Sequence, residues 1–315
     1  MLIKTSDIQL IKSLVNKLKL PSPDSHKGQN GRVLIIGGSS LFHSASIWAA
    51  EIASHFVDIV HYCSTKENEE IFLSYKKKFR NGIIIRQKDL LAYVKEDDAV
   101  LIGPGMLRSE KRWLKNNQSH TNYQFSKIQQ LKNESHLTFY LTKYLINNFS
   151  YKKMVFDAGA LQMMDPSWLK ILTTPPIITP HQQEFENLFK IKISNKTFDD
   201  KIRIVHETAK KYHCVILLKT PADIISDGED DYVIQGGNPG LTKGGTGDLL
   251  AGLCLSFFAK NSPLISATIA SWLLKKSADE LSIFYGNWYN IDNLINQVPQ
   301  TFTKLLKKLE LLKKH

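Results

Sequence analysis

Short, almost continuously apolar runs alternate along this chain with longer segments in which apolar residues recur at helical spacing. Runs such as 215–218 have the length and composition of strands buried on both faces, and segments such as 198–212 have the period of a helix. The apolar runs predict strands at 32–36, 57–63, 82–85, 99–102, 154–156, 176–178, 215–218, 223–226 and 232–234, the last two forming a hairpin. The helical spacing predicts helices at 45–55, 198–212, 248–259 and 264–282. This alternation predicts an α/β fold with a mainly parallel central sheet and helices on both faces.

The two ends of the chain and one internal segment depart from this alternation. Residues 6–19 have helical spacing and precede a proline-bearing loop, so residues 1–25 are expected to form an N-terminal helical extension. The segment 108–134 is polar and poor in strand signal, which indicates an insertion or excursion within one domain over 26–290. A basic C-terminal helix or tail is expected over 291–315.

The composition is that of an ordinary globular chain with a surplus of positive charge. Hydrophobic residues make up 43% and charged residues 23% of the 315 positions, which excludes a disordered chain. The formal net charge is +11, but the lysines are scattered and no nucleic-acid-binding signature accompanies them, so no nucleic-acid partner is expected. The apolar runs are too short to span a bilayer, and the first residues lack a signal-peptide pattern. We therefore expect a cytoplasmic protein with no membrane partner, in which Cys63, Cys214 and Cys254 are buried free thiols.

Glycines and carboxylates follow several predicted strands, at the edge where parallel sheets bind ligands. The run 37–40 reads Gly-Gly-Ser-Ser, and the run 103–105 reads Gly-Pro-Gly. Such glycines let the backbone pass close to a ligand, and they also make ordinary tight turns. Asp157 and Glu184 each follow a later strand. Either could hold Mg²⁺ that bridges nucleotide phosphates, or cap the helix that begins there.

The most informative segment is Gly-Gly-Thr-Gly-Asp at 244–248, directly before an apolar helix. Backbone N–H groups at such a helix start form a phosphate site, because they point outward at the positive end of the helix dipole. Asp248 lies in the same turn, where it can cap the helix or accept a proton. A base beside an anion site is what phosphoryl transfer to a hydroxyl requires, and so much glycine exceeds what a cap needs. We therefore predict that Asp248 is the catalytic base and that Gly245, Thr246 and Gly247 bind the transferred group.

These motifs together resemble a known family. Gly-Gly-Thr-Gly-Asp before an apolar helix is similar to the signature of ribokinase-like small-molecule kinases. The ordered set of motifs over residues 26–285 resembles the ADP-dependent NAD(P)H-hydrate dehydratases. The other motifs that carry this resemblance are His26-Lys27-Gly28, Gly31-Arg32-Val33-Leu34, Gly37-Gly38-Ser39, Gly103-Pro104-Gly105, Asp157-Ala158, Thr179-Pro180-His181, Glu184-Phe185, Leu218-Lys219 and Asn238-Pro239-Gly240.

The resemblance implies a ribokinase-like three-layer sandwich and a repair reaction. NADH or NADPH that has gained water at C6 of the nicotinamide ring is dehydrated, with ADP or ATP as co-substrate, by phosphorylation of the C6 hydroxyl and elimination of phosphate. Some members of the family carry a fused N-terminal epimerase domain, but the segment before His26 is too short to hold one, so a stand-alone dehydratase with its catalytic domain at 26–290 is expected. The resemblance also implies a homo-oligomer, a tetramer. The residues expected to contact the hydrated dinucleotide are Ala45, Gly105, His181 and Asp248. Those expected to contact the nucleotide are Lys219, Thr220, Asp223, Asn238 and Gly247, with Glu184 acting through Mg²⁺.

The chain departs from the family's motifs around both expected pockets. The departures are Gly159 for an aspartate, Gln182 and Gln183 for proline and glycine, Leu107 and Thr220 for glycines, and Thr242-Lys243 for an alanine-threonine pair. Lys243 is either an added phosphate contact or a surface charge. The Gly-Thr-Gly-Asp core is intact, which favours a diverged active enzyme.

Two other functions fit the same residues. A ribokinase-like kinase of another small alcohol, such as a vitamin precursor, would keep Asp248 and explain the altered segments 182–183 and 220–223. A non-catalytic nucleotide-binding protein would fit the basic charge and the polar segment 108–134. A dinucleotide dehydrogenase is disfavoured, because the three-glycine fingerprint and its ribose-binding acid are missing from the sequence.

Overall fold

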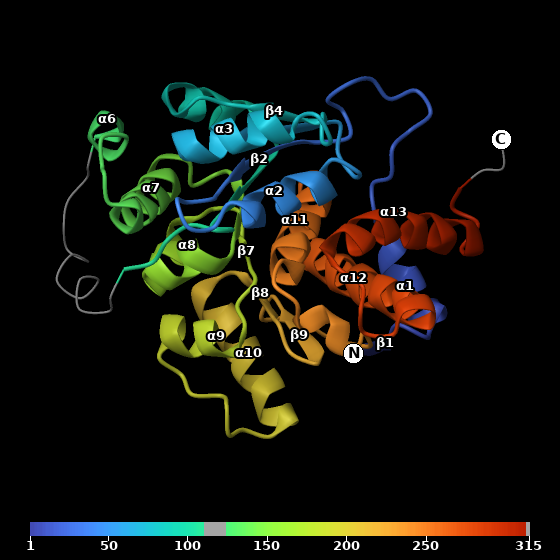
Figure 1. Cartoon of the computed structure of the whole chain (residues 1–315). Helices are drawn as coiled ribbons and strands as arrows, with labels where there is room; N and C mark the ends of the chain where they lie inside the picture. Colours follow the sequence, from blue (N-terminus) through green and yellow to red (C-terminus); the bar gives the residue numbers. More distant parts are fainter. Residues whose placement is uncertain (110–123, 313–315) are drawn as a thin grey trace.

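Ten strands form one mostly parallel sheet across the middle of the molecule (Figure 1). The computed structural model describes residues 1–109 and 124–312. The strands are β1 (Leu2–Lys4), β2 (Arg32–Ile36), β3 (Ile59–Cys63), β4 (Gly82–Ile84), β5 (Ala99–Ile102), β6 (Lys153–Phe156), β7 (Ile177–Ile178), β8 (Val215–Leu218), β9 (Ala222–Ser226) and β10 (Asp231–Gln235). Their order is β1-β10-β9-β8-β7-β6-β5-β2-β3-β4, and among these strands only β9 runs against the others.

Helices cover both faces of this sheet and make three layers (Figure 1). The helices are α1 (Ile8–Val15), α2 (Ser44–Ala53), α3 (Lys66–Tyr75), α4 (Leu90–Glu96), α6 (Phe125–Ile128), α7 (Glu134–Asn148), α8 (Ala158–Met163), α9 (Gln182–Phe189), α10 (Phe198–Tyr212), α11 (Thr246–Phe258), α12 (Pro263–Tyr285) and α13 (Ile291–Lys308). Alternate strand residues enter the two cores, so Val33 and Ile35 pack with α2, α11 and α12, while Leu34 and Ile36 pack with α4, α7 and α8. The expected α/β architecture is confirmed.

Most strands lie where the apolar runs predict them, with two differences of substance. β3 begins at Ile59 rather than Val57, because the amides of Val57 and Asp58 donate to the carbonyls of Ala53 and Gly31 and not to a neighbouring strand. β1 has no counterpart in the predicted elements. Its three residues pair in parallel with β10 at the sheet edge, and so short a run shows no recognisable alternation.

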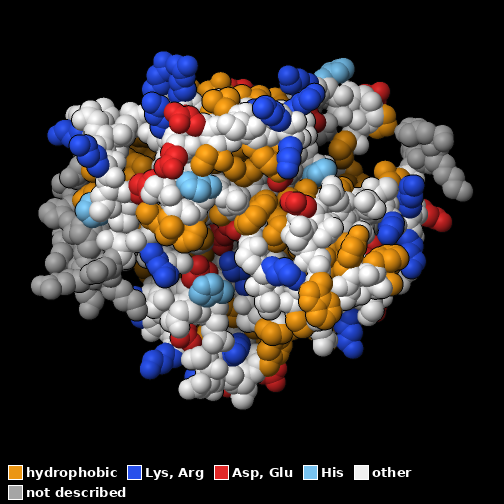
Figure 2. Space-filling model, in the orientation of Figure 1, with side chains coloured by type: hydrophobic (Ala, Val, Ile, Leu, Met, Phe, Trp, Pro, Cys, Tyr) orange, Lys and Arg blue, Asp and Glu red, His pale blue; other side chains and the backbone are white. Residues whose placement is uncertain are grey.

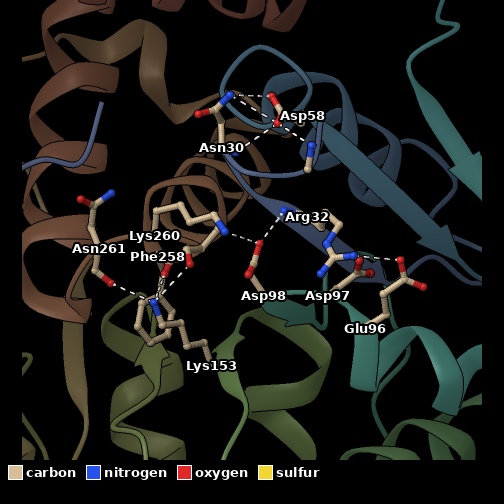
Figure 3. A network of polar contacts seen from close by, with 12 residues as sticks. Asn30, Arg32, Asp58, Glu96, Asp97, Asp98, Lys153, Phe258, Lys260 and Asn261 are labelled. Carbon is tan, nitrogen blue, oxygen red and sulfur yellow. Dashed lines mark hydrogen bonds and ion pairs between the residues drawn. The ribbon is translucent and has the colours of Figure 1, made fainter. Parts of the chain in front are cut away.

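The helix α11 runs through the core beside α2 and α12, and its two ends have opposite chemistry. Its apolar middle is fully buried, as at Leu249. Its last turn meets the ammonium of Lys153, the first residue of β6, which donates to the carbonyls of Phe258, Ala259 and Asn261 at 2.9, 3.2 and 3.3 Å (Figure 3). A cation there offsets the negative end of the helix dipole. The first turn of α11 therefore lies at the opposite edge, where the parallel strands end.

Three further expectations concern the chain as a whole. All three cysteines are free and buried, as predicted. Within residues 1–109 and 124–312, no helix has the length and apolar character needed to cross a membrane. Residues 110–123 of the predicted insertion lie outside the described residues, and the described remainder includes α6.

Candidate active site

The loops that follow the parallel strands meet at one edge of the sheet, beside the start of α11. The turn after β5 packs tightly on its neighbours: a Cβ on Gly103 would lie 1.8 Å from the Asp157 carbonyl oxygen, and one on Gly105 would lie 3.1 Å from Ala45 Cβ. Both glycines have positive φ, of 128° and 71°, so any other residue would be strained as well as crowded. The structure thus places the predicted substrate residues Ala45 and Gly105 side by side.

The first turn of α11 is closed on one side and open on the other. Gly245 is the N-cap residue, with φ of 100° and no side-chain hydrogen bond capping the turn. A Cβ on Gly245 would lie 2.7 Å from the Trp48 ring and 2.8 Å from Ile291 Cγ1, whereas one on Gly244 would meet no described atom within 4 Å. The turn therefore has the glycine-lined form that an anion site needs.

Thr246 and Gly247 complete this turn. The Thr246 amide donates to the Lys243 carbonyl at 3.3 Å, which is a long bond. The Thr246 hydroxyl is buried, and within the described part of the chain it has no hydrogen-bond partner. Burying an unpaired hydroxyl costs free energy, which an oxygen of a bound anion would offset. A Cβ on Gly247 would lie 3.4 Å from Lys219 Nζ, so this glycine leaves the ammonium room beside the turn.

One lysine and three carboxylates gather next to the turn. Lys219 Nζ, just after β8, lies 3.0 Å from Asp157 Oδ1 and 3.9 Å from Glu184 Oε2. The Thr179 hydroxyl also donates to Asp157 Oδ1, at 2.8 Å. Burial lowers the pKa of Lys219, but the charges of Asp157 and Glu184 outweigh it, so the ammonium form is favoured. Figure 2 shows acidic and basic side chains meeting in a recess near the middle of this face.

Asp248 shares this crowded environment. Burial raises its pKa to about 7, the charges of Asp157 and Glu184 add to the rise, and Lys219 opposes it. A carboxyl group with a pKa near neutrality can both accept a proton from a hydroxyl and return it, which is the property of a general base. The prediction that Asp248 is such a base therefore gains a physical rationale.

Glu184, at the start of α9, is held by its neighbours. Its Oε2 accepts from the His181 amide at 2.9 Å, and His181 Nδ1 accepts in return from the amides of Gln183 and Glu184 at 3.1 and 3.2 Å. Its Oε1 accepts from Gln162 Nε2 at 2.9 Å, and Gln162 Oε1 accepts from the Arg108 guanidinium at 2.7 Å. Among the residues described, no group of three His, Cys, Asp or Glu side chains could hold a metal ion. Half of the His181 side chain, 52%, remains exposed.

Asp223 and Asn238, two of the residues predicted to contact the nucleotide, instead form hydrogen bonds within the protein. Asp223 accepts from the Thr220 amide at 2.9 Å and from the Ser271 hydroxyl at 2.7 Å, and it pairs with Lys275 at 3.5 Å. Burial raises the pKa of Asp223, and Lys275 opposes the rise. The Lys275 ammonium also donates to the carbonyls of Thr220 and Pro221. This buried group fixes the loop that follows Lys219 without presenting the Asp223 carboxylate to a ligand.

Asn238 also has a structural role. Its Oδ1 accepts from the Gly240 amide at 3.0 Å and from the Tyr289 hydroxyl at 2.7 Å, and its Nδ2 donates to the Ala278 carbonyl at 2.8 Å. The Lys243 ammonium donates to the Asn287 carbonyl and lies 5.1 Å from the centre of the Tyr289 ring. Asn238 therefore shapes the loop before the first turn of α11.

The comparisons with known proteins agree on one family. A family model described as NAD(P)H-hydrate dehydratase matches residues 33–300. The chain belongs to this family. A bifunctional NAD(P)H-hydrate repair enzyme Nnr from Methanocaldococcus jannaschii is 31% identical over 293 residues, which is 90% of this chain and 50% of that protein. An ADP-dependent (S)-NAD(P)H-hydrate dehydratase from Nitrosopumilus maritimus is 29% identical over 283 residues, covering 86% of each. The chain thus spans about half the length of the bifunctional relative and most of the single-function one.

Solved structures confirm the ribokinase-like fold of this member of the NAD(P)H-hydrate dehydratase family. An ADP/ATP-dependent NAD(P)H-hydrate dehydratase from Bacillus subtilis, co-crystallized with ATP/Mg²⁺, superposes with a TM-score of 0.71 at 20% identity, over 95% of this chain and 97% of that one. A ribokinase-like superfamily protein from Enterococcus faecalis gives a TM-score of 0.69 at 21% identity, over 93% and 94% of the two chains.

Two departures from the dehydratase family's motifs are neighbours in space. A Cβ on Gly159 would lie 2.2 Å from the Met106 carbonyl oxygen. The aspartate that the family usually carries at position 159 therefore has no room here, because the backbone at Met106 occupies its place. Leu107, where the family has glycine, follows in the same segment. Gly159 thus packs against the backbone of the altered segment that follows β5.

Some side chains of this site carry no sequence signal. Gln162 positions Glu184, Trp48 backs Gly245, and Lys275 and Tyr289 fix the two loops beside Lys219 and the α11 turn. Each lies far along the chain from the residue it holds, in a helix or loop whose pattern indicates only packing. A single sequence offers no spacing rule that could have found them.

Proposed function

We propose that this chain repairs hydrated NADH and NADPH, using ADP or ATP to drive the loss of water. The observation that carries the proposal is Asp248, with its pKa of about 7, at the glycine-lined start of α11 and beside Lys219. A base and an anion site in one helix turn, with a cation beside them, are the parts that phosphoryl transfer to a hydroxyl needs.

The chemistry follows from these parts in two steps. Asp248 accepts the proton of the C6 hydroxyl while the hydroxyl oxygen attacks the terminal phosphorus of the nucleotide. The bond between that phosphorus and the bridging oxygen of the leaving group breaks. With ADP as donor the leaving product is AMP. The amides of Gly245, Thr246 and Gly247 and the ammonium of Lys219 stabilise the transferred group. The lone pair of the ring nitrogen then expels phosphate from C6, and a proton leaves the adjacent ring carbon to restore the double bond.

The substrate side of the site comprises Ala45, in the first turn of α2, with Gly105 and His181, which follow β5 and β7. The tight pairing of Ala45 with Gly105 leaves backbone rather than bulky side chains to face a ligand. His181 presents its ring to solvent while its Nδ1 is held by the capping box of α9. We propose that this edge binds the hydrated dinucleotide, with the nucleotide on the other side of Asp248.

The donor set fits Mg²⁺ only in part. Both oxygens of Glu184 already accept hydrogen bonds, from Gln162 and His181, and Asp157 pairs with Lys219. We propose that Mg²⁺ arrives on the phosphates of the nucleotide, since this ion usually keeps waters and few protein ligands. None of the steps above depends on it.

The test is the absorbance band of reduced nicotinamide, followed in a mixture of protein, Mg²⁺ and chemically prepared NADH hydrate. We expect a rise on addition of ADP or ATP, and we expect Asp248→Asn to abolish it while leaving the fold intact. The two nucleotides added in turn identify the donor. A folded wild-type protein that gives no rise with either nucleotide would refute the proposal.

We also propose that the enzyme works in the cytoplasm as a homotetramer, without nucleic acid or membrane. The family resemblance supports the assembly, and the scattered lysines support the absence of nucleic acid. Sedimentation of the purified chain measures the subunit number directly, and a monomer at micromolar concentration would contradict the tetramer.

A further inference from the structure

A group of large apolar side chains is left exposed where α12 ends. Ile283, Phe284, Tyr285 and Trp288 have 77, 82, 50 and 84% of their surface in solvent. Large exposed apolar patches on proteins often serve as binding surfaces. Figure 2 shows exposed hydrophobic side chains on the same face as the central recess.

The segment that carries Trp288 is tied to the anion site. The carbonyl of Asn287 accepts from Lys243, the ring of Tyr289 lies under the same ammonium, and Ile291 backs Gly245. One residue, Gly244, separates Lys243 from Gly245, so their Cα atoms are at most about 7 Å apart. The segment 287–291, which carries Trp288, therefore borders the α11 turn in which the terminal phosphate of a nucleotide would bind.

The conformation around Trp288 holds the indole as a platform. Gly286 adopts φ of 56°, and a Cβ there would lie 3.2 Å from Cε3 and Cζ3 of the ring. The Trp288 amide donates to the Tyr285 carbonyl at 3.0 Å, which closes the turn. One side of the indole thus rests against a glycine that has no side chain, and the rest of the ring is open.

Two of the side chains predicted to contact the nucleotide are not free to bind its base. Asp223 and Asn238, the polar side chains expected near it, are engaged within the protein. An open indole followed by the ammonium of Lys243 matches a flat base followed by phosphates. Bases stack on aromatic rings irrespective of their hydrogen-bonding pattern.

We propose that Trp288 is a stacking platform for the purine base of the nucleotide, and that Lys243 lies along the path of its phosphates. This rests on the proposed function only in requiring a nucleotide at the α11 turn. The proposal makes Lys243 a phosphate contact and makes the exposed surface after α12 part of the nucleotide site. A second copy of this chain is the competing occupant of the same surface.

The test measures binding of ADP to the full chain by titration calorimetry, with inorganic pyrophosphate as the ligand that lacks a base. We expect Trp288→Ala to weaken ADP binding about tenfold, since stacking on one ring contributes affinity of that order. Pyrophosphate binding should stay unchanged, and Trp288→Phe should retain most of the ADP affinity. Ile283→Ala is the matched control, because it removes exposed apolar surface from the same patch but no ring.

The outcomes separate this proposal from its competitor and from the proposed function. Unchanged ADP affinity in Trp288→Ala would overturn the platform. If Ile283→Ala and Trp288→Ala both reduce the sedimenting mass and neither acts selectively on ADP, the patch is a subunit interface. Binding of ADP that depends on Trp288, in a protein that does not dehydrate NADH hydrate, would support the platform and refute the repair activity. A wild-type chain that binds no nucleotide would overturn both.

Discussion

The substitution Asp248→Asn should make the protein more stable at neutral pH while it removes activity. The pKa of Asp248 is raised by burial from 3.8 to about 7 in the folded chain. Between these two pH values the folded state holds a proton that the unfolded state has lost, so the free energy of unfolding falls as pH rises. The penalty is absent below about pH 4, grows up to about pH 7 and is constant above it. Asparagine carries no charge, so the Asp248→Asn variant does not have this penalty.

The size of the gain follows from the same pKa difference. A rise from 3.8 to about 7 corresponds to about 4 kcal/mol at 1.36 kcal/mol per pH unit. A carboxylate in the first turn of a helix also gains up to about 1 kcal/mol from the helix dipole, which asparagine gives up in part. A net gain of about 3 kcal/mol remains above pH 7. For a chain of 315 residues, this raises the melting temperature by about 4–5 °C.

Differential scanning calorimetry of wild type and Asp248→Asn at pH 8 and pH 5 measures this gain. The increase in melting temperature should be largest at pH 8 and clearly smaller at pH 5. Asp200→Asn is the control of opposite sign, because the hydrogen bond from Arg203 lowers the pKa of the Asp200 carboxyl, in the first turn of α10. That variant should not gain stability at pH 8. An Asp248→Asn melting temperature at or below the wild-type value at pH 8 would refute the reasoning.

Three further outcomes are expected. The rate of NADH-hydrate repair should rise with pH through about 7 as Asp248 ionises, and Lys219→Met should move the midpoint of that pH–rate profile upward, because the charge that favours ionisation is gone. Gly245→Ala should cost about 1–3 kcal/mol by chemical denaturation, since φ of 100° and the clash with its neighbours strain any side chain, whereas Gly244→Ala should be nearly neutral. Gln162→Leu should lower kcat more than it raises KM for ADP, because the Gln162 side-chain amide orients Glu184 and does not itself contact the nucleotide. Gln162→Glu should not restore kcat, because it adds a fourth carboxylate to the site.

The sequence was sufficient to predict every strand of the sheet except β1, and also the chemistry expected of the α11 turn. Strands such as Val215–Leu218 are buried on both faces, so their apolar runs are nearly unbroken and easily found. The Gly-Thr-Gly-Asp motif is local, and a helix start fixes where its amides and carboxylate lie. Polar surface helices such as Lys66–Tyr75 lack a strong apolar stripe, and no predicted helix corresponds to them.

The partners of the site residues could not be predicted in the same way. Position in the family's motifs places Asp223 and Asn238 near the nucleotide, but the direction of each side chain depends on Lys275 and Tyr289, which come from α12 and the loop after it. Those contacts arise only when distant segments pack. That Asp223 and Asn238 affect nucleotide binding, through the loops that they hold, stays a prediction.

The contact between Gly159 and the Met106 carbonyl also restricts how this enzyme can evolve. Returning the family's aspartate to position 159 in one step would drive its side chain into a backbone oxygen, so that reversion should be deleterious in this background. The segment around Met106 and Leu107 would have to move first. The two sites are therefore epistatic: a side chain at position 159 can be accommodated only after the backbone at Met106 has moved.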